Sequence, residues 1–177
     1  MKYLVIQIGI AAYSGEPNKD LVEASNRFIE ELAKYYRSRN VVLVMGGYWG
    51  LMKHISDKAC SEGFKVVFIL PEKPRELPPD DSCYIAINTG LDFRQRSEII
   101  VLSSKALAVM GGSVGTIIEI LMSAAAGKPL YILSGYDLPS DRVSSVLEGL
   151  AGYLDFKYRI YHRDPINMAR DLYRELQ

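Results

Sequence analysis

Residues 106–133 read ALAVMGGSVGTIIEILMSAAAGKPLYIL, and this stretch decides the fold. It opens with an apolar run, Ala106–Met110, turns through the glycines at 111–115 and continues with apolar residues at helical spacing to Ala126. A Gly-Lys-Pro segment closes the helical pattern, as glycine and proline commonly do, and a second apolar run follows at Leu130–Leu133. A strand, a glycine turn, a helix and a further strand are typical of a βαβ unit in a parallel sheet.

The same alternation of strand and helix patterns extends over the rest of the chain. Further strands are expected at Tyr3–Ile8, Val41–Met45, Lys65–Leu70, Cys83–Ile87 and Tyr158–Tyr161. Further helices are expected from Asp20 with Glu23 as a capping box, from Leu51, from Asp92 with Gln95 as a capping box, over Arg142–Leu154, and from an Asp164-Pro165 start. The sequence predicts an α/β fold: one Rossmann-like domain over residues 1–177, with a doubly wound, mainly parallel sheet and helices on both faces.

Composition supports a globular chain and argues against some partners. Of 177 residues, 49% are hydrophobic and 24% are charged, and 21 Lys and Arg balance 21 Asp and Glu. Because no net positive charge attracts phosphate groups, neither nucleic acid nor a membrane surface is expected as a partner. Cys60 and Cys83 lie far apart without a CxxC pattern, which indicates neither a zinc site nor a disulfide and favours a reducing cytoplasm. The segment from Pro71 to Asp81 holds half of the eight prolines and is expected to be a surface loop, either a lid or a connector.

Two glycine-rich turns follow expected strands, at Gly46-Gly47-Tyr48-Trp49-Gly50 and at 111–116. Both would open at the carboxyl edge of a parallel sheet, where α/β folds bind ligands. Glycines before a helix let an anion approach the free amides, so a phosphate group is the expected ligand, although the same glycines also suit tight turns and close packing. Neither the dinucleotide fingerprint nor the P-loop pattern is present, and no cofactor or metal is expected.

Ser113 allows an alternative function. Gly111 to Gly115 matches G-x-S-x-G, and Asp137 or Asp141 and then His162 follow in the chain order of an α/β-hydrolase. The chain is short for that fold and lacks an HGGG-type oxyanion segment, so a serine hydrolase ranks third.

Glu119 is the sole charged residue between Ala106 and Gly127. One interpretation is a capping box in which Glu119 folds back toward Thr116 at the start of the helix. In the other, Glu119 reaches the hydroxyl groups of a ligand or a water molecule, and Arg94 or Arg96 supplies the opposite charge.

These residues resemble the Lonely Guy family of cytokinin nucleoside-monophosphate phosphoribohydrolases, often mislabelled as lysine decarboxylases, and the related molybdenum-cofactor carrier-like proteins. The resemblance runs from Met1 to about Leu133. It depends on Gly46 to Met52, similar to the family's G-G-x-x-G-L-M turn, on Arg96, and on Gly111 to Glu119, similar to P-G-G-x-G-T-x-x-E. This chain departs from the family pattern in having Gly111 for proline, Ser113 for the second glycine, and Ser97 for the lysine after the arginine.

The resemblance implies an AMP-like ligand, or a related phosphorylated small molecule, and a homodimer or homotetramer. It implies Arg96 and Glu119 as catalytic residues in hydrolysis of the N-glycosidic bond to free base and ribose 5-phosphate. The nucleotide-binding residues that it implies are Gly46, Gly47, Gly50, Met52, Gly112, Ser113, Gly115 and Thr116. The alternative is a carrier of a nucleotide or of the molybdenum cofactor that hydrolyses nothing.

Overall fold

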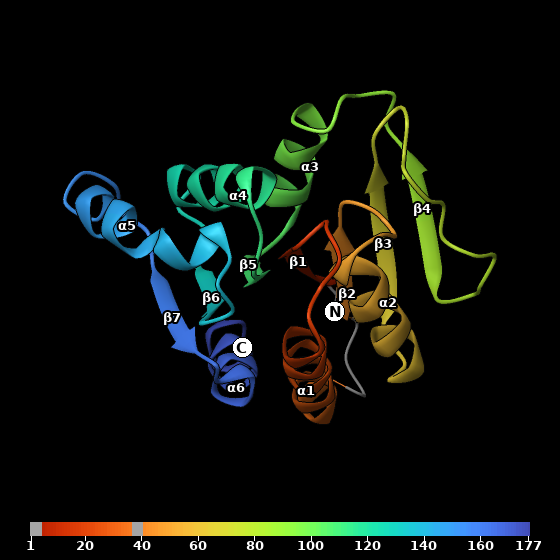
Figure 1. The fold of residues 1–177 in the computed structure, drawn as a ribbon, viewed down its shortest axis with the longest axis horizontal. Coiled ribbons are helices and arrows are strands. Elements are labelled where there is room, and N and C mark those ends of the chain that lie inside the picture. Colours follow the sequence, from red (N-terminus) through yellow and green to blue (C-terminus); the bar gives the residue numbers. More distant parts are fainter. Residues whose placement is uncertain (1–4, 37–40) are drawn as a thin grey trace.

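The computed structural model describes residues 5–36 and 41–177, and a parallel sheet forms its centre (Figure 1). The strands are β1 (Ile6–Ala12), β2 (Val41–Met45), β3 (Lys65–Leu70), β4 (Tyr84–Asn88), β5 (Ala106–Met110), β6 (Leu130–Ser134) and β7 (Tyr158–His162). Their order in the sheet is β4-β3-β2-β1-β5-β6-β7, and each neighbouring pair is parallel. The predicted α/β fold with a doubly wound, Rossmann-like sheet is confirmed.

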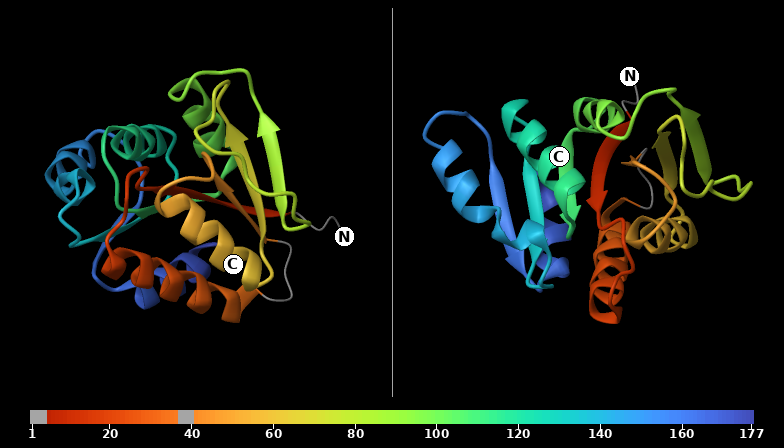
Figure 2. Two further views of the ribbon diagram at one scale, coloured as in Figure 1. Left: turned by 45° about the vertical axis from the view of Figure 1, so that its right-hand side comes forward. Right: turned by 45° about the horizontal axis from the view of Figure 1, so that its top comes forward.

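Helices cover both faces of the sheet (Figures 1 and 2). One face carries α1 (Lys19–Tyr36), α2 (Leu51–Ser61) and α6 (Pro165–Glu175), and the other carries α3 (Gln95–Ser103), α4 (Val114–Ala125) and α5 (Ser144–Leu150). A short 3-10 helix, η1 (Pro139–Arg142), precedes α5. The connecting helices move to the opposite face of the sheet after β4. From β5 onward the strands are added on the other side of β1, so a right-handed crossover then places its helix on that opposite face.

The core lies between the sheet and the helices. Phe28 of α1 and Phe68 of β3 are its largest fully buried side chains, and β5 is buried along its whole length. Burying an aromatic side chain of this size contributes roughly 1.5–3 kcal/mol. A strand that is apolar at every position, such as Ala106–Met110, therefore belongs at the centre of a sheet that is covered on both faces.

Element boundaries differ from the sequence prediction at several places. The strands predicted at Val41–Met45, Lys65–Leu70 and Ala106–Met110 are confirmed. The first strand was predicted at Tyr3–Ile8, but β1 spans Ile6–Ala12 because its pairing with β5 continues to Met110. Tyr3 and Leu4 lie outside the described residues.

The predicted starts of the helices agree with the structure in some cases and differ in others. The capping box at Asp20 is wrong, because the side chain of Asn18 accepts the Leu21 amide at 2.8 Å and α1 begins at Lys19. The reciprocal hydrogen bonds predicted between Asp92 and Gln95 are present, although α3 itself begins at Gln95 after a turn that Asp92 closes. The helix predicted over Arg142–Leu154 is shorter, at Ser144–Leu150, with η1 before it.

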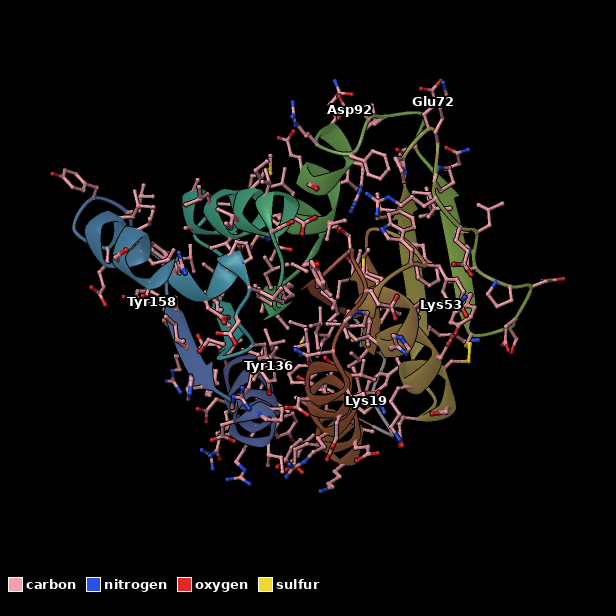
Figure 3. The ribbon with its side chains drawn as sticks, viewed as in Figure 1. Lys19, Lys53, Glu72, Asp92, Tyr136 and Tyr158 are labelled. Atoms are coloured by element: carbon pink, nitrogen blue, oxygen red, sulfur yellow. A yellow bond between two sulfur atoms is a disulfide. The ribbon has the colours of Figure 1, made fainter. Side chains whose placement is uncertain are left out.

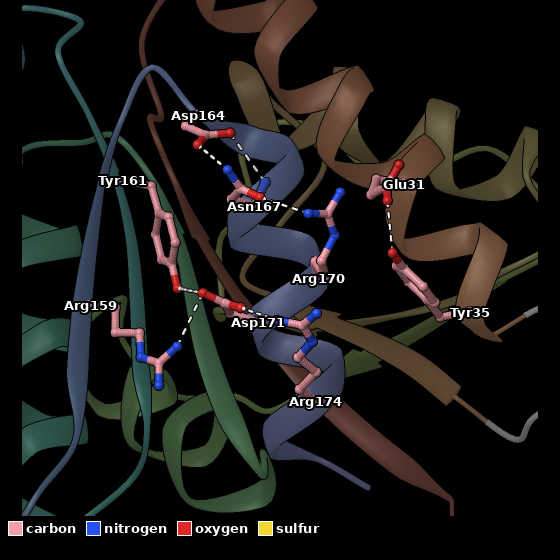
Figure 4. Close-up of polar contacts among 9 residues, drawn as sticks. All are labelled: Glu31, Tyr35, Arg159, Tyr161, Asp164, Asn167, Arg170, Asp171 and Arg174. Atoms are coloured by element: carbon pink, nitrogen blue, oxygen red, sulfur yellow. Dashed lines mark hydrogen bonds and ion pairs between the residues drawn. The ribbon is translucent and has the colours of Figure 1, made fainter.

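The last helix begins as predicted and is attached to β7 by polar contacts (Figure 4). Asp164 caps α6 by accepting the Asn167 amide, with proline at the first helical position. Asp171 of α6 accepts a hydrogen bond from Tyr161 and pairs with Arg159, each at 3.0 Å. Exposed ion pairs contribute less than about 1 kcal/mol each, so the buried face of α6 remains its main anchor.

Cys60 and Cys83 form a disulfide (Figure 3, yellow), so the prediction that the two cysteines are not bridged is wrong. Their Cα atoms are 5.7 Å apart, although 23 positions separate them in the chain. The fold brings the end of α2 next to the start of β4, and linear spacing could not indicate this. The argument from the cysteines for a reducing compartment therefore fails.

Residues 71–83 join β3 to β4 without a helix, although these strands are parallel. The proline-rich segment predicted as a surface loop forms most of this connection. Within residues 5–36 and 41–177, no helix has both the length and the apolar character needed to span a membrane.

Candidate functional site

The candidate site lies at the carboxyl edge of the sheet, where β1 separates the two halves of the strand order. The chain continues from β1 toward β2 on one side, and β5 leads toward β6 on the other. Doubly wound sheets bind ligands in the crevice at this switch point. A cavity of about 250 Å³ opens there, close to the lower end of the range for small-molecule sites.

Most of the predicted site residues line this cavity. Those that do are Gly46, Met52, Arg96, Ser113, Gly115, Thr116 and Glu119. Gly47, Gly50 and Gly112 do not line the cavity and instead shape its two turns. The two glycine turns, 65 positions apart in the chain from Gly46 to Gly111, therefore contribute to one cavity.

The second glycine turn presents the N-terminus of α4 to the cavity. Ser113 is the N-cap residue, and the first helical hydrogen bond runs from the Ile117 amide to the Ser113 carbonyl at 2.9 Å. The amides of residues 114–116 have no partner within the helix, as at every helix start. Because Gly112 has no side chain, the hydroxyl of Thr116 packs against its backbone. This turn can hold an anion.

The first glycine turn provides room for two large side chains. The Arg96 guanidinium lies directly over Gly46, so that a Cβ atom at this position would collide with it. The Trp49 indole lies over Gly47 in the same way. Trp49 and Phe93 both line the cavity and meet edge to face, with 6.0 Å between ring centroids. Trp49 and Phe93 thus form an aromatic wall beside the buried Arg96.

Glu119 lies opposite Arg96 in the cavity. Its Oε1 is 3.6 Å from Nη1 of Arg96 and accepts a hydrogen bond of 2.8 Å from the Ser97 hydroxyl. The capping-box interpretation of Glu119 is wrong, because α4 begins at Val114 and places Glu119 in its second turn, where the side chain contacts α3. The structure brings together two residues that are 23 positions apart in sequence.

Burial controls the ionisation of this pair. It raises the pKa of Glu119, and the Arg96 charge and the Ser97 hydroxyl oppose that rise. Burial also lowers the pKa of Arg96, which Glu119 opposes. Among the described residues, no group hydrogen-bonds to the buried Nε of Arg96. Ionisable groups with shifted pKa values in a cavity, together with an N–H donor that no described group accepts, are typical of a functional site.

Ten residues that line the cavity are not among the predicted site residues, and they include Ser14, Arg75, Phe93 and Ser97. Arg75 belongs to the proline-rich loop, and its Nη1 lies 3.3 Å from the Ser14 carbonyl. The signal for Arg75 was its position just after a buried strand, since such loops gather at the ligand edge of the sheet. Nothing in the sequence indicated which side chain of that loop enters the cavity.

The serine hydrolase arrangement is not assembled. Among the described side chains, no hydrogen bond joins Ser113 to His162, which is exposed at the end of β7 and packs against Gly135. The carboxylate of Asp141 accepts the amides of Tyr136 and Leu138 instead of contacting a histidine. Among the described residues, neither the predicted histidine nor Asp141 is therefore positioned to activate Ser113 as a nucleophile.

Comparisons with known proteins agree with this fold. The family model described as the SLOG cluster4 family matches residues 5–153. The chain belongs to the SLOG cluster4 family. An uncharacterized protein of Archaeoglobus fulgidus is 36% identical to this SLOG cluster4 protein over 124 residues, which cover 70% of this chain and 77% of the relative.

Solved structures extend the likeness to almost the whole SLOG cluster4 chain. The crystal structure of TM1055 is 27% identical with a TM-score of 0.72, and the match covers 97% of this chain and 99% of that one. The molybdenum cofactor carrier protein of Chlamydomonas reinhardtii is 22% identical with a TM-score of 0.75, over 98% and 100% of the two chains. At 22% identity, the similarity to the carrier protein shows a shared fold and not a shared function. The predicted resemblance to the Lonely Guy and carrier-like superfamily is confirmed at the level of family and fold.

Proposed function

We propose that this protein binds an AMP-like nucleoside monophosphate and hydrolyses its N-glycosidic bond. The observation that carries the proposal is the buried Arg96 and Glu119 pair, which shares one cavity with the free amides of α4. A cavity built only for packing does not need a buried carboxylate, because burying ionised groups costs free energy that their mutual attraction often fails to repay.

The phosphate group would bind at residues 113–116. These residues offer helix-start amides, the positive end of the α4 dipole and the Thr116 hydroxyl. Glu119 follows Thr116 by three residues, or about 4.5 Å along the helix axis. This spacing suits a sugar held between the phosphate and the carboxylate, and the base would then extend toward Trp49 and Phe93.

The reaction consumes one water molecule and yields free base and ribose 5-phosphate. The bond between the base nitrogen and C1′ breaks, and its electron pair leaves with the base. The oxygen of water bonds to C1′, where it keeps one proton as the new hydroxyl group, and the other proton passes to the base. The transition state resembles an oxocarbenium ion, which the negative charge of Glu119 would stabilise. Arg96 would bind the phosphate or polarise the leaving base.

A second candidate is a carrier that binds a phosphorylated, pterin-like molecule without cleaving it. Its support is the fold shared with the molybdenum cofactor carrier protein of Chlamydomonas reinhardtii over 98% of this chain. The same phosphate position and aromatic wall would serve this ligand. The two candidates differ in whether a bond breaks.

Incubation with AMP, followed by chromatography for adenine and ribose 5-phosphate, separates the two candidates. The hydrolase proposal expects product from the wild type and a decrease of ~10²–10³-fold in turnover for Glu119→Gln, the usual cost of losing one electrostatic contact to the transition state. Glu98→Gln is the matched control, because Glu98 is exposed on α3 outside the cavity. AMP binding without product favours the carrier, and equal release of adenine by wild type and Glu119→Gln refutes the role of Glu119.

We also propose a homodimer or homotetramer. Its support is the set of exposed apolar side chains on β4 and α3, namely Ile85, Ile87, Ile99 and Leu102. Exposed apolar residues gathered on neighbouring elements often mark an interface. Sedimentation analysis tests this, and a monomer at all concentrations would contradict it.

A further inference from the structure

The proline-rich loop contributes one side chain, Arg75, to the cavity and is attached to neighbouring segments, so it is neither a free lid nor a remote connector. Its Glu72 amide donates to the Leu91 carbonyl at 2.8 Å, and its Glu76 pairs with Lys53 of α2. Figure 3 shows Glu72 and Asp92 at the same end of the molecule, where the loop meets the segment that leads into α3. Prolines at four of its positions restrict the backbone further. The loop is thus held between α2 and α3.

Arg75 is the side chain that this loop delivers to the cavity. Its guanidinium reaches the backbone carbonyl of Ser14, at the carboxyl end of β1, and makes no ion pair with a carboxylate of the described residues. Four further donor hydrogens remain on a guanidinium that makes one hydrogen bond. They are available to a ligand at the cavity mouth.

Arg94 is the second cation at the mouth. It lines the same cavity, it directly follows Phe93 of the aromatic wall, and its side chain also makes no ion pair with a described carboxylate. The nearby Asp92 carboxylate accepts the backbone amides of Arg94 and Gln95 in the turn that leads into α3. Its negative charge is in part committed to the start of the helix.

The charges that line the cavity do not balance. Three guanidinium groups face it, from Arg75, Arg94 and Arg96, against a single carboxylate from Glu119. Arg96 and Glu119 offset each other at 3.6 Å. Arg75 hydrogen-bonds only to a backbone carbonyl, the Asp92 carboxylate lies close enough to Arg94 for the two charges to interact, and neither arginine forms an ion pair with a carboxylate of the described residues. The amides and dipole of α4 already provide for one phosphate group at the opposite turn. Arginine forks fit a further phosphate or carboxylate.

We propose that Arg75 and Arg94 form a second anion subsite at the cavity mouth, so that the ligand carries a second anionic group besides the phosphate held by α4. This inference rests on the proposed function, since it assumes that the first phosphate binds at residues 113–116. It narrows the proposed ligand from any AMP-like nucleotide to one that carries a second phosphate or carboxylate group. The competing possibility is that both arginines bind the same phosphate as α4.

Calorimetric titration with three probes tests the subsite: AMP, ADP and adenosine 3′,5′-bisphosphate, all at one ionic strength. The expected result is that ADP or the bisphosphate binds about tenfold more tightly than AMP, as one charge-assisted contact provides. Arg75→Ala and Arg94→Ala should each reduce this preference and leave the affinity for AMP nearly unchanged. Lys73→Ala, which removes an exposed positive charge from the same loop outside the cavity, should retain the preference.

Two results would overturn the subsite while leaving the proposed function intact. One is equal affinity of the wild type for all three probes. The other is a loss of AMP affinity in Arg75→Ala as large as the loss for the doubly phosphorylated probes, which would assign the arginine to the first phosphate. If none of the probes binds, the proposed function fails and the subsite fails with it.

Discussion

Substituting Gly46 by alanine should displace Arg96 without unfolding the protein. The three atoms nearest to a Cβ at this position all belong to the Arg96 guanidinium, the far end of a flexible side chain. The guanidinium would need to move by about 2 Å to reach the ~3.5–4.0 Å of an ordinary contact. The backbone of Gly46 has no left-handed φ, so alanine can adopt it.

The effect on Glu119 follows from the distance. The largest effect arises if Nη1 moves directly away from Oε1, from 3.6 Å to about 5.6 Å, which weakens the attraction by about 1.6 kcal/mol at an effective dielectric constant of about 20. Because Arg96 opposes the rise that burial causes in the Glu119 pKa, its displacement should raise that pKa further. An energy of about 1.6 kcal/mol corresponds to at most about a fifteenfold decrease in the acid dissociation constant of Glu119.

The assay is the pH dependence of the carboxyl carbon resonance of Glu119, assigned by its disappearance in Glu119→Gln. Gly149→Ala is the control, since this glycine of α5 is exposed and nothing surrounds its added Cβ. Thermal unfolding would verify that both variants are folded. An unchanged titration of Glu119 in a folded Gly46→Ala variant would refute the claim that Gly46 positions Arg96 against Glu119.

Measurements of stability and labelling test other features of the structure. Reduction of the Cys60 and Cys83 disulfide, or Cys60→Ser with Cys83→Ser, should lower the free energy of unfolding by about 3 kcal/mol, as expected for a bridge spanning 23 positions; denaturant unfolding that is insensitive to reductant would argue against the bridge. Arg96→Met should destabilise the protein by about 3–5 kcal/mol, because it leaves Glu119 buried without its cation, and adding Glu119→Gln should restore most of that loss; equal losses in the single and double variants would contradict this. Because the pKa of Glu119 is raised by folding, its contribution to stability is fully present below the unfolded pKa of about 4.3 and is lost as the pH rises through the folded pKa; Glu119→Gln should remove this part of the pH dependence, whereas Glu98→Gln should keep it. A fluorophosphonate probe should leave Ser113 unlabelled, and labelling that Ser113→Ala abolishes would restore the serine hydrolase interpretation.

The sequence predicts most of the sheet because its strands are buried on both faces. Continuous apolar runs such as Val41–Met45 and Ala106–Met110 have one favourable position, at the centre of a covered sheet. The ends of the strands are harder to predict, because pairing with a distant strand extends β1 to Ala12, beyond the apolar run in its own sequence. Which side chain caps a helix depends on the local backbone geometry, and here the side chain of Asn18, not that of Asp20, accepts the Leu21 amide.

The site could be predicted in part. The glycine turns and Glu119 stand out in sequence, because glycines and a lone glutamate are conspicuous in apolar surroundings, whereas Arg96 was distinguished from Arg94 only by the family resemblance. The contact of Glu119 with Ser97, the Cys60 to Cys83 bridge and the entry of Arg75 into the cavity join segments by their position in the fold. Spacing along the chain carries no signal for contacts of that kind.

Titration of AMP into the wild type and into Gly115→Trp tests the central claim most directly. Gly115 lines the cavity in the first turn of α4, and a Cβ there meets no atom within 4 Å, so an indole can project into the space assigned to the phosphate. The account predicts saturable binding of AMP by the wild type and by Gly149→Trp, and no binding by a folded Gly115→Trp variant. Undiminished affinity in Gly115→Trp, or no binding by the wild type, would contradict it.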